Sequence, residues 1–424
     1  MQSEVHNETV CAARKDRDYS FTAVPSDARK GIISLLAVMV GFSFTSSSMV
    51  TGAKMGLNSD LLNFIYALLL GGIFLSIYTG ILAYIGGRTG LSFDLLCRRA
   101  FGRFGSMLPS LLLTLTQIGW FGVCSAMLAI PVAEHLGCSV YPVLAVACMF
   151  MIYTAYIGFK GLEILSYIAV PMILVLGGWS VWQAICSGSQ SFVETFNSST
   201  GENDLNMMIG LVIGSFISGG TTTPNFTRFA RTARFAVIST VTAFMIGNSI
   251  MIMFGAVGAN YAGKDDVFYI MMSQGLVLSA FVVLGANIWT TNDNALYSVG
   301  LSLANIFSIR KKLMVLAGGF AGTVCALWLY HNFISWLQFL GATLPAIGII
   351  LILDYFCSPD KYTHSETGSN FSWAAIAGTV CGMLAGNFLE FGCGGINSMI
   401  AAAAVWAVMS RVMKVLKPET FVSN

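Results

Sequence analysis

Long apolar stretches, each about twenty residues long and separated by short polar segments, dominate this sequence. A helix of that length is long enough to cross the hydrocarbon core of a bilayer. Reading the chain with a window of roughly 20 residues predicts about twelve transmembrane helices. They fall near residues 30–54, 61–85, 106–132, 139–159, 163–186, 205–226, 234–259, 275–306, 312–329, 333–356, 372–390 and 395–413.

The helix predicted at 205–226 contains a stretch that disfavours a continuous helix. Ser218, two glycines and three threonines follow one another there, and Pro224 closes the run. Glycine lowers helix propensity, and proline removes a backbone donor and crowds the carbonyl four residues earlier. A broken helix is tolerated at membrane depth only where it is buried in protein or lines a wet cavity. We therefore predict a discontinuous helix with ligand-binding main-chain groups; a hydroxyl-rich helix end packed at the interface is the alternative.

The first predicted helix carries a similar stretch. Val40–Thr51 reads VGFSFTSSSMVT, and like the stretch from Gly214 it places a glycine, an aromatic residue and a cluster of small hydroxyl residues at mid-span. The two helices are five spans apart, so they cross the membrane in opposite directions. Paired interrupted helices at matching positions are typical of inverted-repeat transporters.

The predicted fold is therefore an all-α polytopic membrane protein with discontinuous helices 1 and 6. Two inverted five-helix repeats occupy residues 30–186 and 205–356, and two additional helices occupy residues 372–413. An N-terminal tail at 1–29 and a C-terminal tail at 414–424 complete the chain.

Composition and charge agree with this class. Hydrophobic residues make up 56% of the chain and charged residues only 10%, whereas soluble domains are about a quarter charged. With a cytosolic N-terminus, every Lys and Arg except Lys54 and Lys264 falls in a segment predicted to lie on the inner side. The positive-inside rule therefore predicts that both termini are cytosolic. The net charge of +2 does not indicate nucleic-acid binding, because the basic residues lie between apolar runs.

The residues that enzymatic chemistry needs do not form a pattern. The ten cysteines are scattered, with no CxxC or metal-ligand spacing. The four histidines lie at or near span ends, and there is no HExxH motif, no Ser/His/Asp set and no pair of carboxylates at depth. We therefore expect neither an enzyme nor a cofactor. A channel would usually show rings of like residues in an oligomer, so a carrier is the favoured class.

Polar residues also occur inside the third predicted helix. Gln117 and Trp120 are three residues apart and share one helix face, and Gly119 lets another segment approach the backbone. The pair indicates a contribution to a ligand site. Packing by the indole and interhelical hydrogen bonding by the amide are the alternative.

The eighth predicted helix has a denser polar cluster. A stripe of neutral oxygens with i, i+3, i+4, i+7 spacing is formed by Asn287, Thr290, Thr291 and Asn294. Several neutral oxygens together suit a hard monovalent cation. Asp293 points elsewhere on the helix, where it either has a functional role, such as carrying a coupled proton, or pairs with a basic loop residue.

Several separated motifs together point to one family. They are TQIGWFG in the third helix, GSFISGGT in the sixth, NIWTTNDNALY in the eighth, and VPSDARKG, GFSFTSSSM and TGILAYIGGRTGL nearer the N-terminus. With them the chain resembles the cytosine permease branch of the nucleobase–cation symporters. The resemblance implies the leucine-transporter architecture, to which the inverted repeat also points. It further implies uptake of cytosine with a cation, sodium in the bacterial members, across the inner membrane.

The resemblance also assigns roles to individual residues. It implies that a base stacks between aromatic faces and pairs with amide and main-chain groups. The residues that would do so are Gln117, Trp120, Ser215, Phe216, Ser218, Gly219 and Asn292. The resemblance also places the break in the sixth helix, where the base meets main-chain groups, at Ser215–Gly219. It implies a sodium site formed by Gly41, Phe44, Asn287, Thr290 and Thr291.

Two features set limits to the resemblance. Asn292 lies well around the helix from Asn287, so both serve one site only if the eighth helix faces a shared cavity on two sides. Gly219-Gly220 followed by three threonines and Pro224 departs from the family pattern. Uracil, purine or hydantoin-like substrates, and proton coupling, therefore stay open as alternatives.

Overall fold

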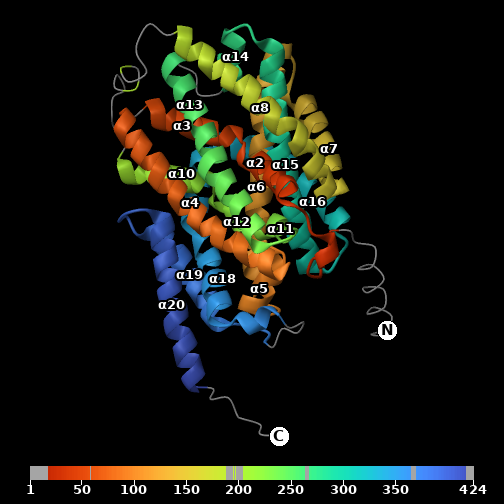
Figure 1. Cartoon of the computed structure of the whole chain (residues 1–424), viewed down its shortest axis with the longest axis vertical. Coiled ribbons are helices and arrows are strands. Elements are labelled where there is room, and N and C mark those ends of the chain that lie inside the picture. Colours follow the sequence, from red (N-terminus) through yellow and green to blue (C-terminus); the bar gives the residue numbers. More distant parts are fainter. Residues whose placement is uncertain are drawn as a thin grey trace.

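The computed structural model describes residues 18–57, 59–187, 194, 196, 204–262, 267–363 and 369–416. This part of the chain is all-α, as predicted (Figure 1). The first half contains η1 (Ser26–Ala28), α2 (Ile32–Ser43), α3 (Ser46–Leu57), α4 (Leu61–Thr89), α5 (Phe93–Phe101), α6 (Met107–Leu136), α7 (Val140–Ile157) and α8 (Phe159–Ser187). The second half begins with α10 (Leu205–Thr221), α11 (Pro224–Thr227), α12 (Ala233–Val241), η2 (Thr242–Gly247), α13 (Asn248–Ala262), α14 (Val267–Ser273) and α15 (Val277–Phe307). It ends with α16 (Lys311–His331), α17 (Phe333–Thr343), α18 (Pro345–Cys357), η3 (Pro359–Tyr362), α19 (Trp373–Phe388) and α20 (Gly394–Leu416).

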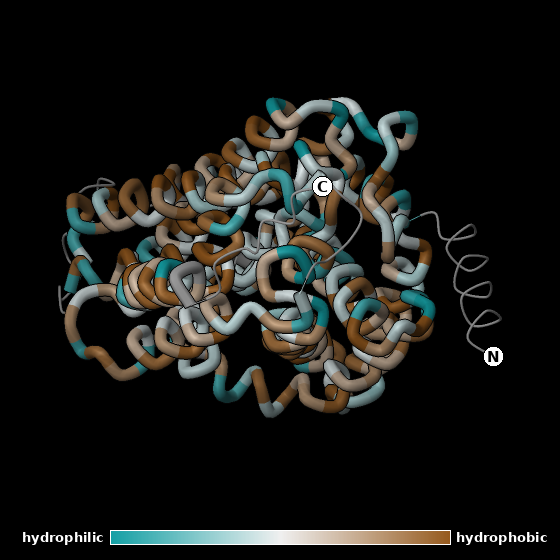
Figure 2. Tube along the Cα trace, turned by 90° about the horizontal axis from the view of Figure 1, so that it is seen from below, coloured by the Kyte–Doolittle hydropathy of each residue, from teal (hydrophilic) through white to brown (hydrophobic). Residues whose placement is uncertain are grey.

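Length and composition make most of these helices candidates for membrane spans. Within the described ranges, nine qualify, or ten if the bent pair of α2 and α3 is one span. The two remaining predicted spans coincide with α15, which carries the polar stripe, and α19, which has only 16 residues. Hydrophobic residues recur along the outer helices of the body (Figure 2). Many of their large side chains are exposed, and Ile77, Trp182 and Phe320 are each at least 60% exposed. Such a surface suits contact with lipid.

The predicted interruption of the first span is confirmed. α2 ends at Ser43, α3 begins at Ser46, and the two helices are bent by 51°. The Phe44 amide donates to the Val40 carbonyl at 3.0 Å and ends the hydrogen-bond ladder of α2. Phe44 and Thr45 form a buried link, which is the setting in which a membrane helix tolerates a break.

The sixth span is interrupted within the predicted run from Ser218 to Pro224, but later than Ser215–Gly219, where the resemblance places the break. α10 stays helical through Ser215 and Gly219, and the chain turns only at Thr222 and Thr223. Thr222 Oγ1 donates to the Gly219 carbonyl at 2.7 Å. This hydroxyl therefore occupies a main-chain acceptor that the sequence suggested would face a ligand.

The small residues here bond back to their own helix or pack closely against a neighbouring one. Thr221 Oγ1 donates to the Ile217 carbonyl at 2.8 Å, one turn back along α10. A Cβ at Gly220 would lie 2.6 Å from Thr79 Cγ2, so glycine at this point serves close packing against α4. Pro224 is the first residue of α11, where its missing N–H is not needed.

The second half of the first span, α3, packs directly against α13 of the seventh span. A Cβ at Gly52 of α3 would overlap the carbonyl oxygen of Ile252, and a Cβ at Gly255 of α13 would overlap that of Met49. Small residues let the two backbones touch, as is common between membrane helices. Immediately before α13 the span contains the π-helical turn η2.

Segments predicted to lie on the inner side meet at one end of the molecule. The Lys30 amide donates to the Phe229 carbonyl at 2.5 Å, and the Arg231 amide donates to the Lys30 carbonyl at 2.9 Å. Lys30 Nζ lies 3.1 Å from Glu163 Oε2. The start of the first span and the segments after the fourth and sixth spans therefore share one side, as the predicted topology requires.

We predict that Cys138 is labelled from outside intact cells, whereas Cys357 is labelled only after permeabilisation. Both thiols are exposed, and they lie at opposite ends of the predicted topology, after α6 and at the end of α18. Cys97, also predicted to be cytosolic, is buried in α5 and serves as an unreactive control. The measurement is the mass shift of single-cysteine variants with a membrane-impermeant maleimide. Labelling of Cys357 in intact cells would reverse the orientation.

Candidate functional site

A small buried cavity lies where the break in the first span meets α6, α10 and α15. Its volume is about 20 Å³, which is room for roughly one water molecule. It is lined by Phe42, Thr45, Ser47, Gln117, Trp120, Ser215, Phe216, Ser218, Gly219, Thr291 and Ala295. Six of the seven predicted substrate contacts are among these residues. The fold thus brings helices that are far apart in the sequence to one place.

Helix α6 contributes an aromatic ring and an amide to the cavity. Trp120 Nε1 donates to Ser218 Oγ at 2.6 Å, which ties α6 to α10. Phe333 of α17 contacts the indole edge-on, with 5.9 Å between ring centroids. Gln117 is buried, and its Nε2 has no hydrogen-bond partner in the described part of the chain. Leaving such a donor unpaired costs about 1–3 kcal/mol. A ligand that accepts a hydrogen bond from it would remove this cost and so bind more tightly.

Helix α10 contributes Phe216, whose ring is fixed by two neighbours. Phe42 contacts it edge-on at 5.1 Å between centroids and 83°, and Phe244 of η2 contacts it at 5.0 Å. A Cβ at Gly219 would overlap the rings of both Phe216 and Phe42. Glycine at this position is therefore required by the aromatic wall of the cavity.

The first turn of α3 is capped by a side chain from α15. Asn287 Oδ1 accepts from the Ser46 amide at 2.5 Å and from Ser46 Oγ at 3.0 Å. The first amides of a helix have no partner within it, and the membrane core offers no water in their place. Thr291 Oγ1 lies 3.2 Å from the carbonyl oxygens of both Phe44 and Asn287. Three of the predicted ion ligands therefore meet at the break.

The other two predicted ion ligands are held differently. Thr290 Oγ1 donates back into its own helix, to the Ala286 and Asn287 carbonyls at 3.1 and 3.0 Å. Gly41 packs against Ser166 of α8, and as a last-turn residue of α2 its carbonyl has no helical partner. The described residues include no group of three His, Cys, Asp or Glu that could hold a metal ion. A cation at this break would be held by neutral oxygens.

Asn292, the seventh predicted substrate contact, does not line this cavity. Its Nδ2 donates to the Phe121 carbonyl at 3.2 Å and to Ser125 Oγ at 2.9 Å, and lies 3.2 Å from Met151 Sδ. Five residues separate Asn292 from Asn287, which is about 140° around a helix. The two side chains therefore face different neighbours, and Asn292 joins α15 to α6 and α7.

Asp293 also faces away from the cavity, toward α7. Its Oδ1 accepts from Thr154 Oγ1 at 2.6 Å, and the same hydroxyl accepts from Trp289 Nε1 at 2.8 Å. The carboxyl group is fully buried, and none of the ion pairs within the described ranges includes it. The pairing with a basic loop residue, which the sequence left open, does not occur there.

Three cavity residues of the first span are absent from the predicted contacts, although the sequence contains a signal for them. Phe42, Thr45 and Ser47 all belong to the motif GFSFTSSSM. Thr45 Oγ1 lies 3.0 Å from Ser47 Oγ. The motif predicts the break correctly, but which of its side chains turn inward depends on how α3 leaves the break.

Asn248, at the start of α13, is a further polar residue that the sequence does not mark. Its Oδ1 accepts from Ser48 Oγ at 2.6 Å, and its Nδ2 lies 3.5 Å from Ser215 Oγ. It follows the π-helical turn η2 directly, and π-turns often occur at functional sites. A single asparagine in an apolar run forms no pattern, so only the structure identifies this contact between α3, α10 and α13.

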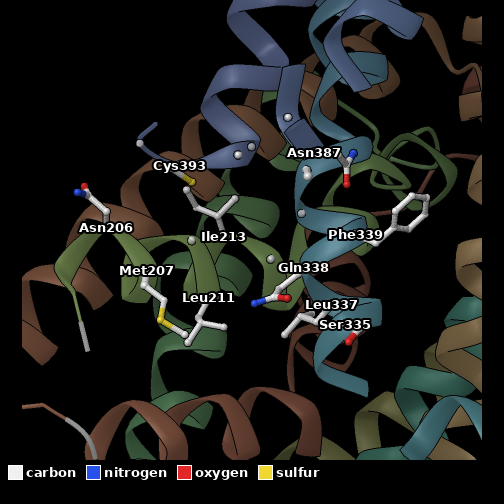
Figure 3. A pocket seen from close by; sticks show the side chains of 18 residues that line it. Asn206, Met207, Leu211, Ile213, Ser335, Leu337, Gln338, Phe339, Asn387 and Cys393 are labelled. Carbon is white, nitrogen blue, oxygen red and sulfur yellow. The ribbon is translucent and has the colours of Figure 1, made fainter. Parts of the chain in front are cut away.

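A larger cleft lies between α10, α17 and the connection from α19 to α20 (Figure 3). Its volume is about 430 Å³, and Gln338 and Leu337 of α17 point into it. Met207, Leu211 and Gly214 line it from α10. Their spacing of four and three residues puts them on one helix face, which leads toward the buried cavity.

Trp336 of α17 lies against the backbone of α6. A Cβ at Gly119 would overlap its indole ring. The prediction that Gly119 lets another segment approach closely is therefore confirmed. Together with the contact of Phe333 on Trp120, this places α17 directly beside the cavity.

Solved structures with the same arrangement of helices are membrane transporters. Mhp1, a nucleobase-cation-symport-1 family transporter, in a closed conformation with bromovinylhydantoin bound, matches with a TM-score of 0.79 at 18% identity over 93% of this chain and 95% of that chain. A Na⁺-coupled sialic acid symporter in a substrate-bound outward-open state matches with a TM-score of 0.71 at 13% identity over 91% and 90%. The fold is that of this class of transporters.

The chain belongs to the family of permeases for cytosine/purines, uracil, thiamine and allantoin, whose profile matches residues 23–411. Cytosine permease of Escherichia coli K12 is 44% identical over 403 residues, 94% of this chain and 96% of that protein. Hydantoin permease of Microbacterium maritypicum is 24% identical over 302 residues, 63% and 61% of the two chains. The protein is therefore a multi-pass membrane permease and not an enzyme, as predicted.

We predict that Trp120→Ala and Phe216→Ala each weaken ligand binding by about tenfold to more than a hundredfold, because one stacking face is worth roughly 1–3 kcal/mol. The matched control Trp406→Ala removes a buried indole from α20, which does not line the cavity. Binding is measured by titration calorimetry with a panel of nucleobases on purified protein. A folded Trp120→Ala protein with unchanged affinity would remove α6 from the site.

Proposed function

We propose that the protein imports cytosine by symport with sodium through alternating access. The observation that carries the proposal is the convergence of α6, α10 and the broken first span on one cavity, which shares Thr291 with the break. Identity of 44% to a cytosine permease over nearly the whole chain supports the choice of base. The charge distribution supports cytosolic termini, and the similarity to a permease of Escherichia coli supports a bacterial inner membrane.

The cavity wall offers the groups that a small planar base needs. Trp120 and Phe216 supply aromatic surface for stacking. The unpaired Nε2 of Gln117 suits a base carbonyl, and the Ser218 hydroxyl can donate or accept at the base edge. Room for roughly one water is too little for a base, so binding requires the surrounding helices to move apart. Opening and closing around a central site is what alternating access describes.

The break in the first span offers sodium a set of neutral oxygens. The Phe44 carbonyl and the Thr291 hydroxyl already lie 3.2 Å apart, and Asn287 holds the start of α3 beside them. An ion at this point would join the first span to α15 and favour one relative position of the two. A substrate that binds best to the same position gains affinity, and the coupling is reciprocal.

Coupling to a proton is the second candidate, and it would depend on Asp293. That carboxyl group is buried among α7 and α15 residues and bonded to Thr154, away from the cavity. A proton there would have to act on the substrate site through the position of α15. The sodium site at the break needs no such relay, which favours sodium.

The substrate and the ion are tested together on purified protein in vesicles. Saturable cytosine uptake should follow an inward sodium gradient and stop when that gradient is collapsed by an ionophore. Uracil, hypoxanthine and hydantoin serve as competitors. Stronger competition by one of these than by unlabelled cytosine would show that this compound is the preferred substrate. Flux that does not depend on any ion gradient would contradict a symporter.

We predict that Thr291→Ala lowers the sodium dependence of cytosine binding, whereas Asp293→Asn leaves it largely intact. The first change removes a hydroxyl beside the Phe44 carbonyl; the second removes a charge that faces α7. Losing one of the few neutral ligands of the ion should raise the sodium concentration for half-maximal effect by about tenfold. A tenfold change corresponds to about 1.4 kcal/mol of sodium-binding free energy. The measurement is cytosine affinity against sodium concentration.

Thr379→Ala is the matched control for this comparison. Thr379 is a buried threonine of α19 whose hydroxyl likewise donates to a carbonyl one turn back, that of Ala375. It should leave the sodium dependence unchanged. Cytosine affinity that ignores sodium but follows pH, with the pH response erased in Asp293→Asn, would show that the protein is coupled to protons.

A further inference from the structure

A short segment just before the first span lies at the inner end of the molecule, near α16 (Figure 1). Asp18, Tyr19 and Ser20 precede η1 and contact helices from both halves of the chain. None of the three has a role in the cavity. Their contacts nonetheless involve two buried basic side chains, those of Arg228 and Lys311.

Arg228, which follows α11, is fully buried and depends on this segment. Its Nη2 donates to the Asp18 carbonyl at 2.7 Å and to the Tyr297 hydroxyl at 3.0 Å. Its Nη1 donates to the Tyr19 carbonyl at 2.9 Å, and its Nε to the Asn225 carbonyl at 3.1 Å. If the donors of a buried guanidinium lose their hydrogen-bond partners, the folded protein is strongly destabilised. The segment therefore completes the contact between α11 and α15.

The Asp18 side chain binds α16 and the turn between α7 and α8. Its carboxylate forms an ion pair with Lys311 at the start of α16, and Lys311 is buried. Asp18 Oδ1 also accepts from the Phe159 amide at 3.2 Å. Gly158 has φ of +94°, and a Cβ there would overlap the Asp18 carboxylate. The turn between α7 and α8 is thus shaped to receive this carboxylate.

The backbone of the segment is itself held in an unusual conformation. Tyr19 has φ of +52°, a left-handed conformation that is unfavourable for a non-glycine residue and persists only when its surroundings impose it. Asn305 Nδ2 donates to the Ser20 carbonyl at 3.0 Å. The bonds to Arg228 and Asn305 on either side of Tyr19 supply such surroundings.

We infer that Asp18–Ser20 is a clamp that holds the inner end closed. It joins α11 at the end of the sixth span to α15, α16 and the turn before α8, and these elements must separate for a ligand to leave the cavity toward the inner side. Asp18 is the centre of the clamp, because its carbonyl binds Arg228 and its carboxylate binds Lys311. The inference rests on the alternating access proposed above.

The test measures how often the inner end opens. Ser298 of α15 is buried between the cavity residue Ala295 and the clamp, and its hydroxyl accepts from Asn225. Ser298→Cys, in a background without exposed cysteines, is exposed to a small water-soluble thiol reagent from the inner side. Asp18→Asn should raise its labelling rate about fivefold or more, the population change expected when roughly 1 kcal/mol is lost.

Lys361→Gln is the matched control. Its ion pair with Asp354, at 2.8 Å, also lies near the inner end but joins only α18 to the turn that follows it. This variant should leave the labelling rate unchanged. Lys311→Gln should reproduce the effect of Asp18→Asn, and the double variant should add little, because both remove one interaction. Thermal unfolding of each variant confirms that the protein remains folded.

Two outcomes would overturn the clamp. One is an unchanged labelling rate in Asp18→Asn, and the other is an equal rise in Lys361→Gln. Adding cytosine and sodium to the Ser298→Cys parent separates this result from the proposed function. If they leave labelling of the parent unchanged, the proposed substrate or ion is wrong, while the comparison of Asp18→Asn with Lys361→Gln still reports on the clamp.

Discussion

A helix that begins in the middle of a membrane needs partners for its first amides, and here the side chain of Asn287 supplies one. Its Oδ1 accepts both the amide and the hydroxyl of Ser46. The bond fixes where α3 starts and how α3 is set against α15. The Phe44 carbonyl, Thr291 and the cavity residues Thr45 and Ser47 take their positions from this junction. Without it, the break would leave unpaired backbone groups that hydrocarbon does not tolerate.

The sequence predicts this part of the molecule well because the physical signal is local. Hydroxyl residues in the middle of an apolar run indicate a break, and a stripe of neutral oxygens on α15 indicates its partner. The same signal contains the sixth break, at Thr222 and Thr223, whereas the family resemblance places that break too early, at Ser215–Gly219. Threonine hydroxyls that could have left the backbone free instead donate to the carbonyls of Ile217 and Gly219. Whether a hydroxyl bonds its own helix or a ligand depends on rotamers that composition does not specify.

Other features depend on how helices rotate against one another, which spacing alone does not fix. Asn292 belongs to the same motif as Asn287, yet it bonds α6 and α7 because it lies on another face of α15. Asn248 and the contact of Arg228 with the N-terminal segment join residues that are far apart in the sequence. No periodicity marks such pairs. Most residues that line the cavity could be predicted from the sequence. The hydrogen bonds of Asn248, Asn292 and Arg228, which hold the surrounding helices together, could not.

The contact of α3 with α13 has a mechanical consequence. Gly52 and Gly255 bring the two backbones together with no side chain between them to yield or slide. α3 and α13 are therefore joined as one rigid pair. The pair is bounded by the link of Phe44 and Thr45 on one side and by the wider turn of η2 on the other. Under the proposed alternating access, a bulkier residue at this contact would alter how quickly the central cavity opens before it altered what the cavity holds.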